Sequence, residues 1–190
     1  IRRILIPKDM MDSVKEDLSR EIATARVGNP AEKGVKVGPL ATARQVKDAH
    51  TGLERLKEVA TPVYGDGGRA ELVGVEGDKG YFFSPVLLEA KDAKAPAIHD
   101  REIFGPVATL IPYSGSAEEA AELLGLGRGS LVSSVYSDKA DFALSMTLEV
   151  APFLGRLHLA SKKVAELSAG PGVVMPTLVH GGPGRAGGGE

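Results

Sequence analysis

The sequence predicts an α/β domain with a largely parallel sheet flanked by helices. Short apolar runs rich in Val, Ile and Leu alternate along the chain with amphipathic helical patterns, which is typical of parallel strands joined by helices. The 190 residues, 43% of them hydrophobic and 25% charged, can form one domain with a substantial core. We therefore expect a single domain over residues 1–190, with a loop-rich segment at 161–190 that lacks periodicity.

Strands are expected where apolar or β-branched residues cluster between turn-forming residues. The predicted ranges are 1–6, 61–64, 81–88, 107–113, 130–136 and 153–159. Pro85 cannot donate a ladder hydrogen bond, so it indicates that the third of these strands lies at a sheet edge or contains a bulge. Residues 28–40 are expected to form an ordered loop, and residues 69–79 a surface hairpin.

Helices are expected where apolar residues recur every three or four positions. The predicted ranges are about 10–26, 42–60, 117–125 and 139–149. Asp9, Ser116 and Asp138 precede three of these ranges. Each is a candidate N-cap, because its side-chain oxygen can accept a hydrogen bond from an amide of the first turn.

The composition excludes several kinds of partner. A net charge of −2 gives no electrostatic reason to expect nucleic acid or an anionic membrane surface. No apolar run approaches the roughly 20 residues that span a bilayer, and nothing resembles a signal peptide. We therefore expect a cytoplasmic protein with neither nucleic acid nor a membrane as a partner.

The reactive side chains are limited in kind. Cysteine is absent, which excludes disulfides, thiolate metal sites and a cysteine nucleophile within the chain. The four histidines are His50, His99, His158 and His180. They lack the close pairs typical of a metal site, so we expect structural or solvated histidines and no bound metal. Arg2 and Arg3 are expected to be solvated charges beside the first strand.

The most informative stretch is residues 100–107. An acid, Glu102, and an aromatic residue, Phe104, precede the stiff turn Gly105-Pro106. In extended backbone Glu102 and Phe104 point to the same side, where a carboxylate could accept hydrogen bonds from two hydroxyls beside an aromatic wall. This arrangement suits a ligand made of a sugar and a ring. The alternative is a strand-entry turn with Phe104 in the core and Glu102 in solvent.

The run Glu102-Ile103-Phe104-Gly105-Pro106-Val107 resembles the Glu-x-Phe-Gly-Pro motif of the aldehyde dehydrogenase superfamily. Three further stretches resemble that family in the same order along the chain: Gly38-Pro39-Leu40, Phe83-Ser84-Pro85-Val86-Leu87 and Gly129-Ser130-Leu131-Val132-Ser133-Ser134-Val135. The resemblance implies the fold of the family's catalytic domain and NAD or NADP as the cofactor. It also implies that Glu102 holds hydroxyls of the nicotinamide ribose and that Phe104 packs beside the same part of the cofactor.

The C-terminal stretch, residues 178–190, resembles one branch of that family, the semialdehyde dehydrogenases of CoA-linked aromatic degradation. This branch includes the dehydrogenase half of the phenylacetate ring-opening protein and the dehydroadipyl-CoA semialdehyde enzymes. The resemblance places His180, Gly181 and Gly182 in the substrate channel, although the same glycines could form a surface loop or, less readily, a phosphate cradle. Pro171 stands where this branch tends to have His, so the exact aldehyde stays open.

The same resemblance implies that the chain is part of a longer enzyme. Residues 1–6 correspond to the strand just after the family's nucleophilic cysteine, whereas the general base and the dinucleotide-binding domain lie upstream. We therefore expect a homo-oligomeric parent that oxidises an aldehyde, with a CoA-thioester aldehyde as a candidate substrate. The isolated chain is expected to be inactive, with no catalytic residue of its own, and not to bind NAD(P). The alternatives are a non-catalytic α/β module for assembly or interaction, and a free-standing nucleotide binder.

Overall fold

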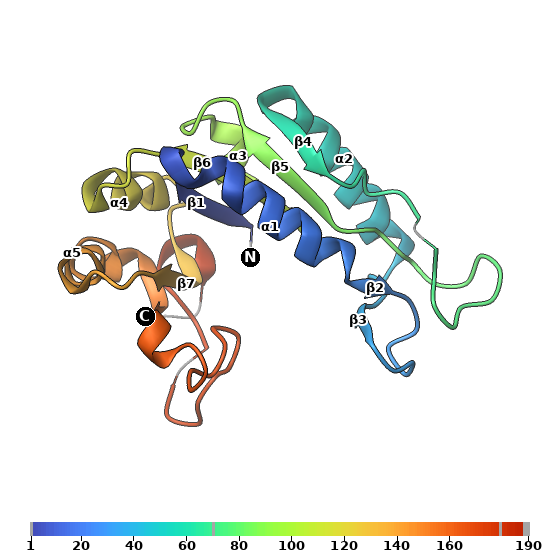
Figure 1. Ribbon diagram of the computed structural model, residues 1–190. Helices are drawn as coiled ribbons and strands as arrows, with labels where there is room; N and C mark the ends of the chain where they lie inside the picture. Colours follow the sequence, from blue (N-terminus) through green and yellow to red (C-terminus); the bar gives the residue numbers. More distant parts are fainter. Residues whose placement is uncertain (1, 70, 179, 188–190) are drawn as a thin grey trace. The chain divides into compact units, whose positions relative to one another are not determined.

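The computed structural model describes residues 2–69, 71–178 and 180–187 (Figure 1). The chain divides into two units, Ile1–Tyr113 and Ser114–Glu190, each built around its own sheet. The interpretation of residues 1–190 as a single domain stays a prediction.

The first unit contains a four-stranded sheet in the order β1-β6-β5-β4. Its strands are β1 (Arg3–Pro7), β4 (Ala60–Tyr64), β5 (Val86–Ala90) and β6 (Val107–Tyr113). β6 pairs in parallel with both β1 and β5, whereas β4 joins β5 antiparallel. The predicted α/β class with a mostly parallel sheet is therefore confirmed. A small separate ladder pairs β2 (Arg26–Val27) with β3 (Val35–Val37).

Helix α1 (Met11–Ala23) packs on one face of this sheet through a periodic apolar stripe. Val14, Leu18 and Ile22 lie against a buried cluster that includes Leu87 and Leu110. Because strand side chains alternate, the neighbours of Leu87 along β5 point away from α1. Helix α2 (Ala43–Val59) contacts β4 and the short helix α3 (Pro96–Asp100), and its own buried stripe consists of Ala49, Leu53 and Leu56.

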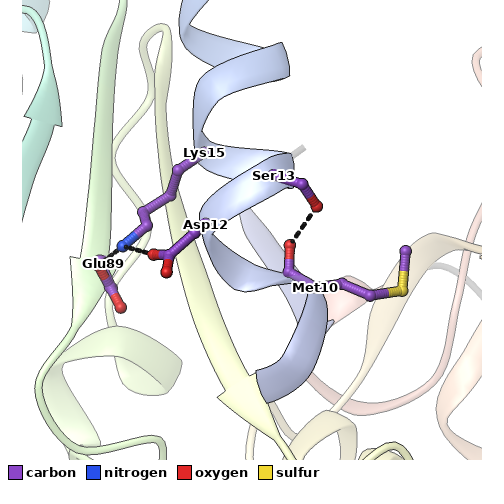
Figure 2. A network of polar contacts seen from close by, with 5 residues as sticks. All are labelled: Met10, Asp12, Ser13, Lys15 and Glu89. Atoms are coloured by element: carbon purple, nitrogen blue, oxygen red, sulfur yellow. Dashed lines mark hydrogen bonds and ion pairs between the residues drawn. The ribbon is translucent and has the colours of Figure 1, made fainter.

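A charged contact also joins α1 to the sheet. Figure 2 shows Lys15 reaching from α1 to Glu89 on β5, with Nζ 3.0 Å from Oε2 of Glu89 and 2.9 Å from Oδ1 of Asp12. These two hydrogen bonds, first that with Asp12 and then that with Glu89, raise the pKa of Lys15 above its ordinary value. One turn earlier, the Ser13 hydroxyl donates to the carbonyl oxygen of Met10 at 2.9 Å.

The strand predicted at 81–88 lies further along the chain than expected. Pairing begins only at Val86, whose amide donates to the carbonyl oxygen of Pro106 at 2.9 Å. Phe82 and Phe83 are buried in the preceding loop, so their apolar run reflects core anchoring and not a ladder. The edge position inferred from Pro85 is wrong, because β5 lies between β6 and β4. The alternative inferred with it, a bulge, has a counterpart in the β4–β5 ladder, whose register shifts between Pro62 and Tyr64, opposite Leu88 and Leu87.

Two further local predictions were wrong in the region between α1 and β5. The expected loop at 28–40 contains the strand β3. Within the described part of 69–79, Val73 forms an isolated β-bridge with Gly28, and the expected hairpin is not formed. The Val73 amide donates to the carbonyl oxygen of Val27 at 3.0 Å. The segment therefore joins the small β2–β3 ladder, a long-range pairing that local turn residues do not reveal.

The second unit contains the parallel pair β7 (Ser130–Tyr136) and β8 (Leu154–Ala160), together with α4 (Ala117–Gly125) and α5 (Ala140–Val150). The two helices contact each other, and buried Leu123, Met146 and Val150 belong to them. Short 3-10 turns occupy Ala151–Phe153, Lys162–Val164 and Gly184–Ala186 in this unit, and Lys8–Met10 in the first unit. Within the described residues, no helix is both long and apolar enough to cross a membrane.

Of the three candidate caps, only Ser116 caps a helix. Its Oγ accepts a hydrogen bond from the Glu119 amide at 3.2 Å, and Oε2 of Glu119 accepts one from the Ser114 amide at 2.7 Å. The N-cap of α1 is Met10 and not Asp9. The N-cap of α5 is Lys139, because Asp138 instead accepts a hydrogen bond from the Lys162 amide at 2.8 Å.

Candidate functional site

Glu102 and Phe104 lie in the connection between α3 and β6, on the surface of the first unit. The backbone is extended at Arg101 and then turns tightly, because the Gly105 amide donates to the carbonyl oxygen of Ile103 at 2.9 Å. Glu102 is exposed, and 72% of Phe104 is exposed. Phe104 is therefore not a core residue. Half-buried Ile103 supplies the inward contact instead.

Glu102 lines a pocket of about 340 Å³ between α2 and residues 100–103. The lining residues are Asp48, Thr51, Gly52, Arg55, Asp100, Arg101, Glu102 and Ile103. The carboxylates can accept hydrogen bonds from ligand hydroxyls, whereas the two guanidinium groups can donate. The pocket is therefore chemically suited to a hydroxyl-rich, polar ligand. Phe104 is not among its lining residues, so the aromatic wall predicted beside Glu102 lies outside this pocket.

Sequence reasoning missed the contribution of α2 to this pocket. Asp48, Thr51 and Arg55 are three and four residues apart, a spacing that puts them on one face of a helix. The predicted apolar stripe of the same helix implied a polar opposite face. What the sequence could not indicate is that this polar face lies beside Glu102.

The segment before Glu102 is attached to β1 through His99 and two arginines. His99 is 1% exposed, its Nδ1 lies 2.9 Å from Nη1 of Arg3, and its Nε2 lies 2.7 Å from the carbonyl oxygen of Ala93. Arg2 donates from Nη1 to the carbonyl oxygen of Arg101. The interpretation of the two arginines as solvated charges is therefore wrong. Burial lowers the pKa of the His99 imidazole below its ordinary value, an effect that the nearby guanidinium charges reinforce.

His180, Gly181 and Gly182 lie in the second unit, on a loop against the first residues of β7 and β8. Both glycines are buried, whereas His180 is exposed. A Cβ atom added at Gly182 would lie 2.6 Å from the carbonyl oxygen of Ser130, and one added at Gly155 would overlap that of Gly181. Close backbone packing thus explains the glycines at 155 and 182 structurally. Their role in a substrate channel, like that of His180, stays a prediction.

The loop after β8 is attached to that strand by side chains that alternate along it. Nε2 of His158 lies 3.3 Å from the hydroxyl oxygen of Ser168, and Nη1 of Arg156 donates to the carbonyl oxygen of Val173 at 3.1 Å. Leu167, at 87% exposure, projects from this loop. Among the described residues there is no group of three or more His, Asp and Glu side chains placed to hold a metal ion.

Comparisons with known proteins identify the kind of protein to which this chain is similar. Residues 1–161 match the family described as "Aldehyde dehydrogenase family". Over 184 residues the chain is 38% identical to the 3,4-dehydroadipyl-CoA semialdehyde dehydrogenase of Aromatoleum evansii. That alignment covers 96% of this chain but 36% of the relative, so the chain spans about a third of the relative's length.

Solved structures share this fold. Lactaldehyde dehydrogenase from Escherichia coli superimposes with a TM-score of 0.78 at 25% identity, covering 99% of this chain and 36% of that one. Succinic semialdehyde dehydrogenase from Streptococcus pyogenes, solved in complex with NADP+, gives a TM-score of 0.77 at 24% identity and covers 97% of this chain and 36% of that one.

Proposed function

Because the chain belongs to the aldehyde dehydrogenase family, we propose that it forms the part of the catalytic domain that follows the nucleophile in an NAD(P)-dependent enzyme. The full-length enzyme would oxidise an aldehyde to the corresponding acid. The chain contains no cysteine, so the nucleophile of this reaction would belong to upstream residues. The chain aligns with only 36% of the relative's length, which supports the proposal that it is one part of a longer enzyme.

The observation that carries the proposal is the motif Glu102–Val107 beside a polar pocket. The Glu102 carboxylate is exposed at the pocket, and the exposed Phe104 ring follows it on the same tight turn. These two side chains would hold the nicotinamide ribose, the carboxylate by accepting hydrogen bonds from hydroxyls and the ring by apolar contact. When bound, the nicotinamide supplies the acceptor for hydride from the aldehyde carbon. Glu102 and Phe104 would therefore orient the cofactor without forming a bond.

For the substrate, we propose a CoA-linked semialdehyde of aromatic-compound degradation. The support is the 38% identical relative, whose name specifies a CoA semialdehyde. His180, Gly181 and Gly182 would form part of the substrate channel. Of these, only His180 is exposed and could contact a substrate directly. Comparing kcat/KM for a CoA-thioester semialdehyde and for the free semialdehyde acid tests this assignment, and a preference for the free acid would contradict it.

Glu102→Gln in the full-length enzyme tests the cofactor assignment. Hydrogen bonds to a charged group are worth about 1.5–3 kcal/mol, so the KM for NAD(P) should rise roughly ten- to a hundredfold. The folded state should be unaffected, because Glu102 is exposed. Glu16→Gln, on the exposed face of α1, is the matched control and should leave the cofactor KM unchanged. An equal cofactor KM in the Glu102 variant and the wild type would refute the assignment.

A second function, as a module for assembly, is favoured by apolar side chains on the surface of the second unit. Leu144, Leu148 and Leu167 are 59%, 70% and 87% exposed. Such residues typically mark an interface when they form a patch. We propose a cytoplasmic homo-oligomer as the parent enzyme. Analytical ultracentrifugation of the full-length protein checks this state, and a monomer at micromolar concentration would exclude it.

A further inference from the structure

The partners of His99 determine which nitrogen of its ring carries the proton. A guanidinium group can only donate, so the Arg3 contact at 2.9 Å requires Nδ1 of His99 to accept. A carbonyl oxygen can only accept, so the Ala93 contact at 2.7 Å requires Nε2 to donate. Both contacts are satisfied by one species, the neutral imidazole protonated on Nε2. A second proton on Nδ1 would place an N–H group opposite the N–H group of Arg3.

The residues after His99 are held at two further points. The carbonyl oxygen of Arg101 accepts a hydrogen bond from Nη1 of Arg2, the residue that precedes β1. Ile103 packs so closely on α2 that a Cβ atom at Gly52 would lie 2.7 Å from its Cγ1 atom. Glu102 therefore lies between two residues that are attached to different elements. Its exposed side chain does not have to hold its own backbone in place.

We propose that His99 is a positioning residue for Glu102, fixing the backbone of residues 99–103 through its contacts with Arg3 and Ala93. This inference rests on the proposed role of Glu102 in binding the cofactor ribose. His99 itself is buried, so its proposed action is through the backbone and not through contact with a ligand. It acts by keeping the Glu102 carboxylate in one place.

Acid pH should weaken this attachment. Burial lowers the pKa of His99, and the charges of Arg3 and Arg2 on the β1 side lower it further, whereas the Ala93 contact and Asp100 on its own helix oppose the shift. The neutral ring is therefore retained in the folded state below pH 6.5, the ordinary value. As the pH falls further, protonation breaks the Arg3 contact. The cofactor KM should therefore rise at acid pH, and this rise does not require Glu102 to change its charge.

The first test compares His99→Gln, His99→Leu and Arg3→Met in the full-length enzyme. The Gln side chain can donate and accept hydrogen bonds but does not titrate. The His99→Gln variant should therefore lose the rise in cofactor KM at acid pH. Leu removes both contacts and should raise the cofactor KM roughly tenfold at neutral pH, since small displacements of binding groups have effects of this size or larger. Arg3→Met removes the contact that protonation would break, so its cofactor KM should already be raised at neutral pH and should not rise further at acid pH. Exposed His50→Gln is the control and should change neither quantity.

The second test does not depend on the cofactor. Hydrogen exchange of the full-length protein should be about tenfold faster in a peptide spanning residues 101–107 of the Leu variant, and unchanged in residues 11–23 of α1. If α1 also exchanges faster, the fold has been lost and the Arg3→Met profile decides. Unchanged exchange at 101–107 in the Leu variant, or an acid rise in the cofactor KM of Arg3→Met equal to that of the wild type, would overturn the proposal. If Glu102→Gln leaves cofactor KM unchanged, the proposed function fails while the exchange result still decides the role of His99.

Discussion

Gly52 lies in the middle of α2, where glycine normally weakens a helix. Replacing it by alanine in an exposed helix would stabilise the protein by about 0.8–1.0 kcal/mol through helix propensity. Here the new Cβ atom would lie 2.7 Å from Cγ1 and 3.0 Å from Cδ1 of Ile103. Overpacking of this kind costs about 1–3 kcal/mol. The overlap therefore outweighs the propensity gain, and Gly52→Ala should destabilise the first unit by roughly 1 kcal/mol.

Urea unfolding of the chain measures this change, with Gly125→Ala as the control. Gly125 is also helical but has nothing within 4 Å of an added Cβ atom, so its substitution should be neutral or stabilising. Ile103→Ala removes the opposing Cγ1 atom, and the pair should show a coupling of about 0.5–3 kcal/mol in a double-mutant cycle. A stabilised Gly52→Ala variant, or additivity with Ile103→Ala, would refute the packing argument. In the full-length enzyme the same substitution should raise the cofactor KM, because Ile103 adjoins Glu102.

Two further predictions concern contacts elsewhere in the chain. Lys15→Met keeps the apolar stem but removes the charge that joins α1 to Glu89, so it should lower stability modestly, and the loss should shrink in about 1 M salt, where the Debye length is about 3 Å. The pKa of Lys15 is raised in the folded state. The stability difference between the wild type and Lys15→Met should therefore have its full size below pH 10.5 and vanish as the pH rises through the folded-state pKa. Urea unfolding at several pH values checks this. Gly155→Ala would drive a side chain into the backbone of Gly181 and should destabilise the second unit by at least about 1–3 kcal/mol. Thermal unfolding compares it with Gly170→Ala, which meets open space, and equal melting temperatures would contradict the close packing.

Local patterns predicted the parts of the fold that depend on local chemistry. Ser116 was identifiable as a cap because its partner amide is three residues away, and the stripe Ala49, Leu53, Leu56 followed directly from helical spacing. Phe82 and Phe83 misled the prediction because burial in a loop and burial in a strand produce the same apolar run. The β2–β3 ladder was missed because its strands are short and its bridge to Val73 is distant in sequence.

The candidate site also has one part that the local sequence predicts and another that depends on tertiary structure. Glu102 and Phe104 were recognisable because the motif is contiguous. The pocket residues Asp48 and Arg55 and the contact between Arg3 and His99 depend on how distant elements meet, 96 residues apart in the latter case. Solvated arginines beside a strand and arginines bound to a buried histidine have the same local sequence. Only the tertiary structure distinguishes them.

The attachment of His99 to β1 has a consequence for the length of the connection that carries Glu102. Arg3 is paired with Thr109 across β1 and β6, and it also contacts His99, so residues 99–109 close a ring with β1. Adding or removing a residue between His99 and Val107 would change the circumference of that ring while both attachment points stay in place. Surface loops normally absorb such changes, but here the added or missing residue would displace Glu102 relative to His99 or to β6. The number of residues between the buried histidine and β6 is therefore itself a part of the site.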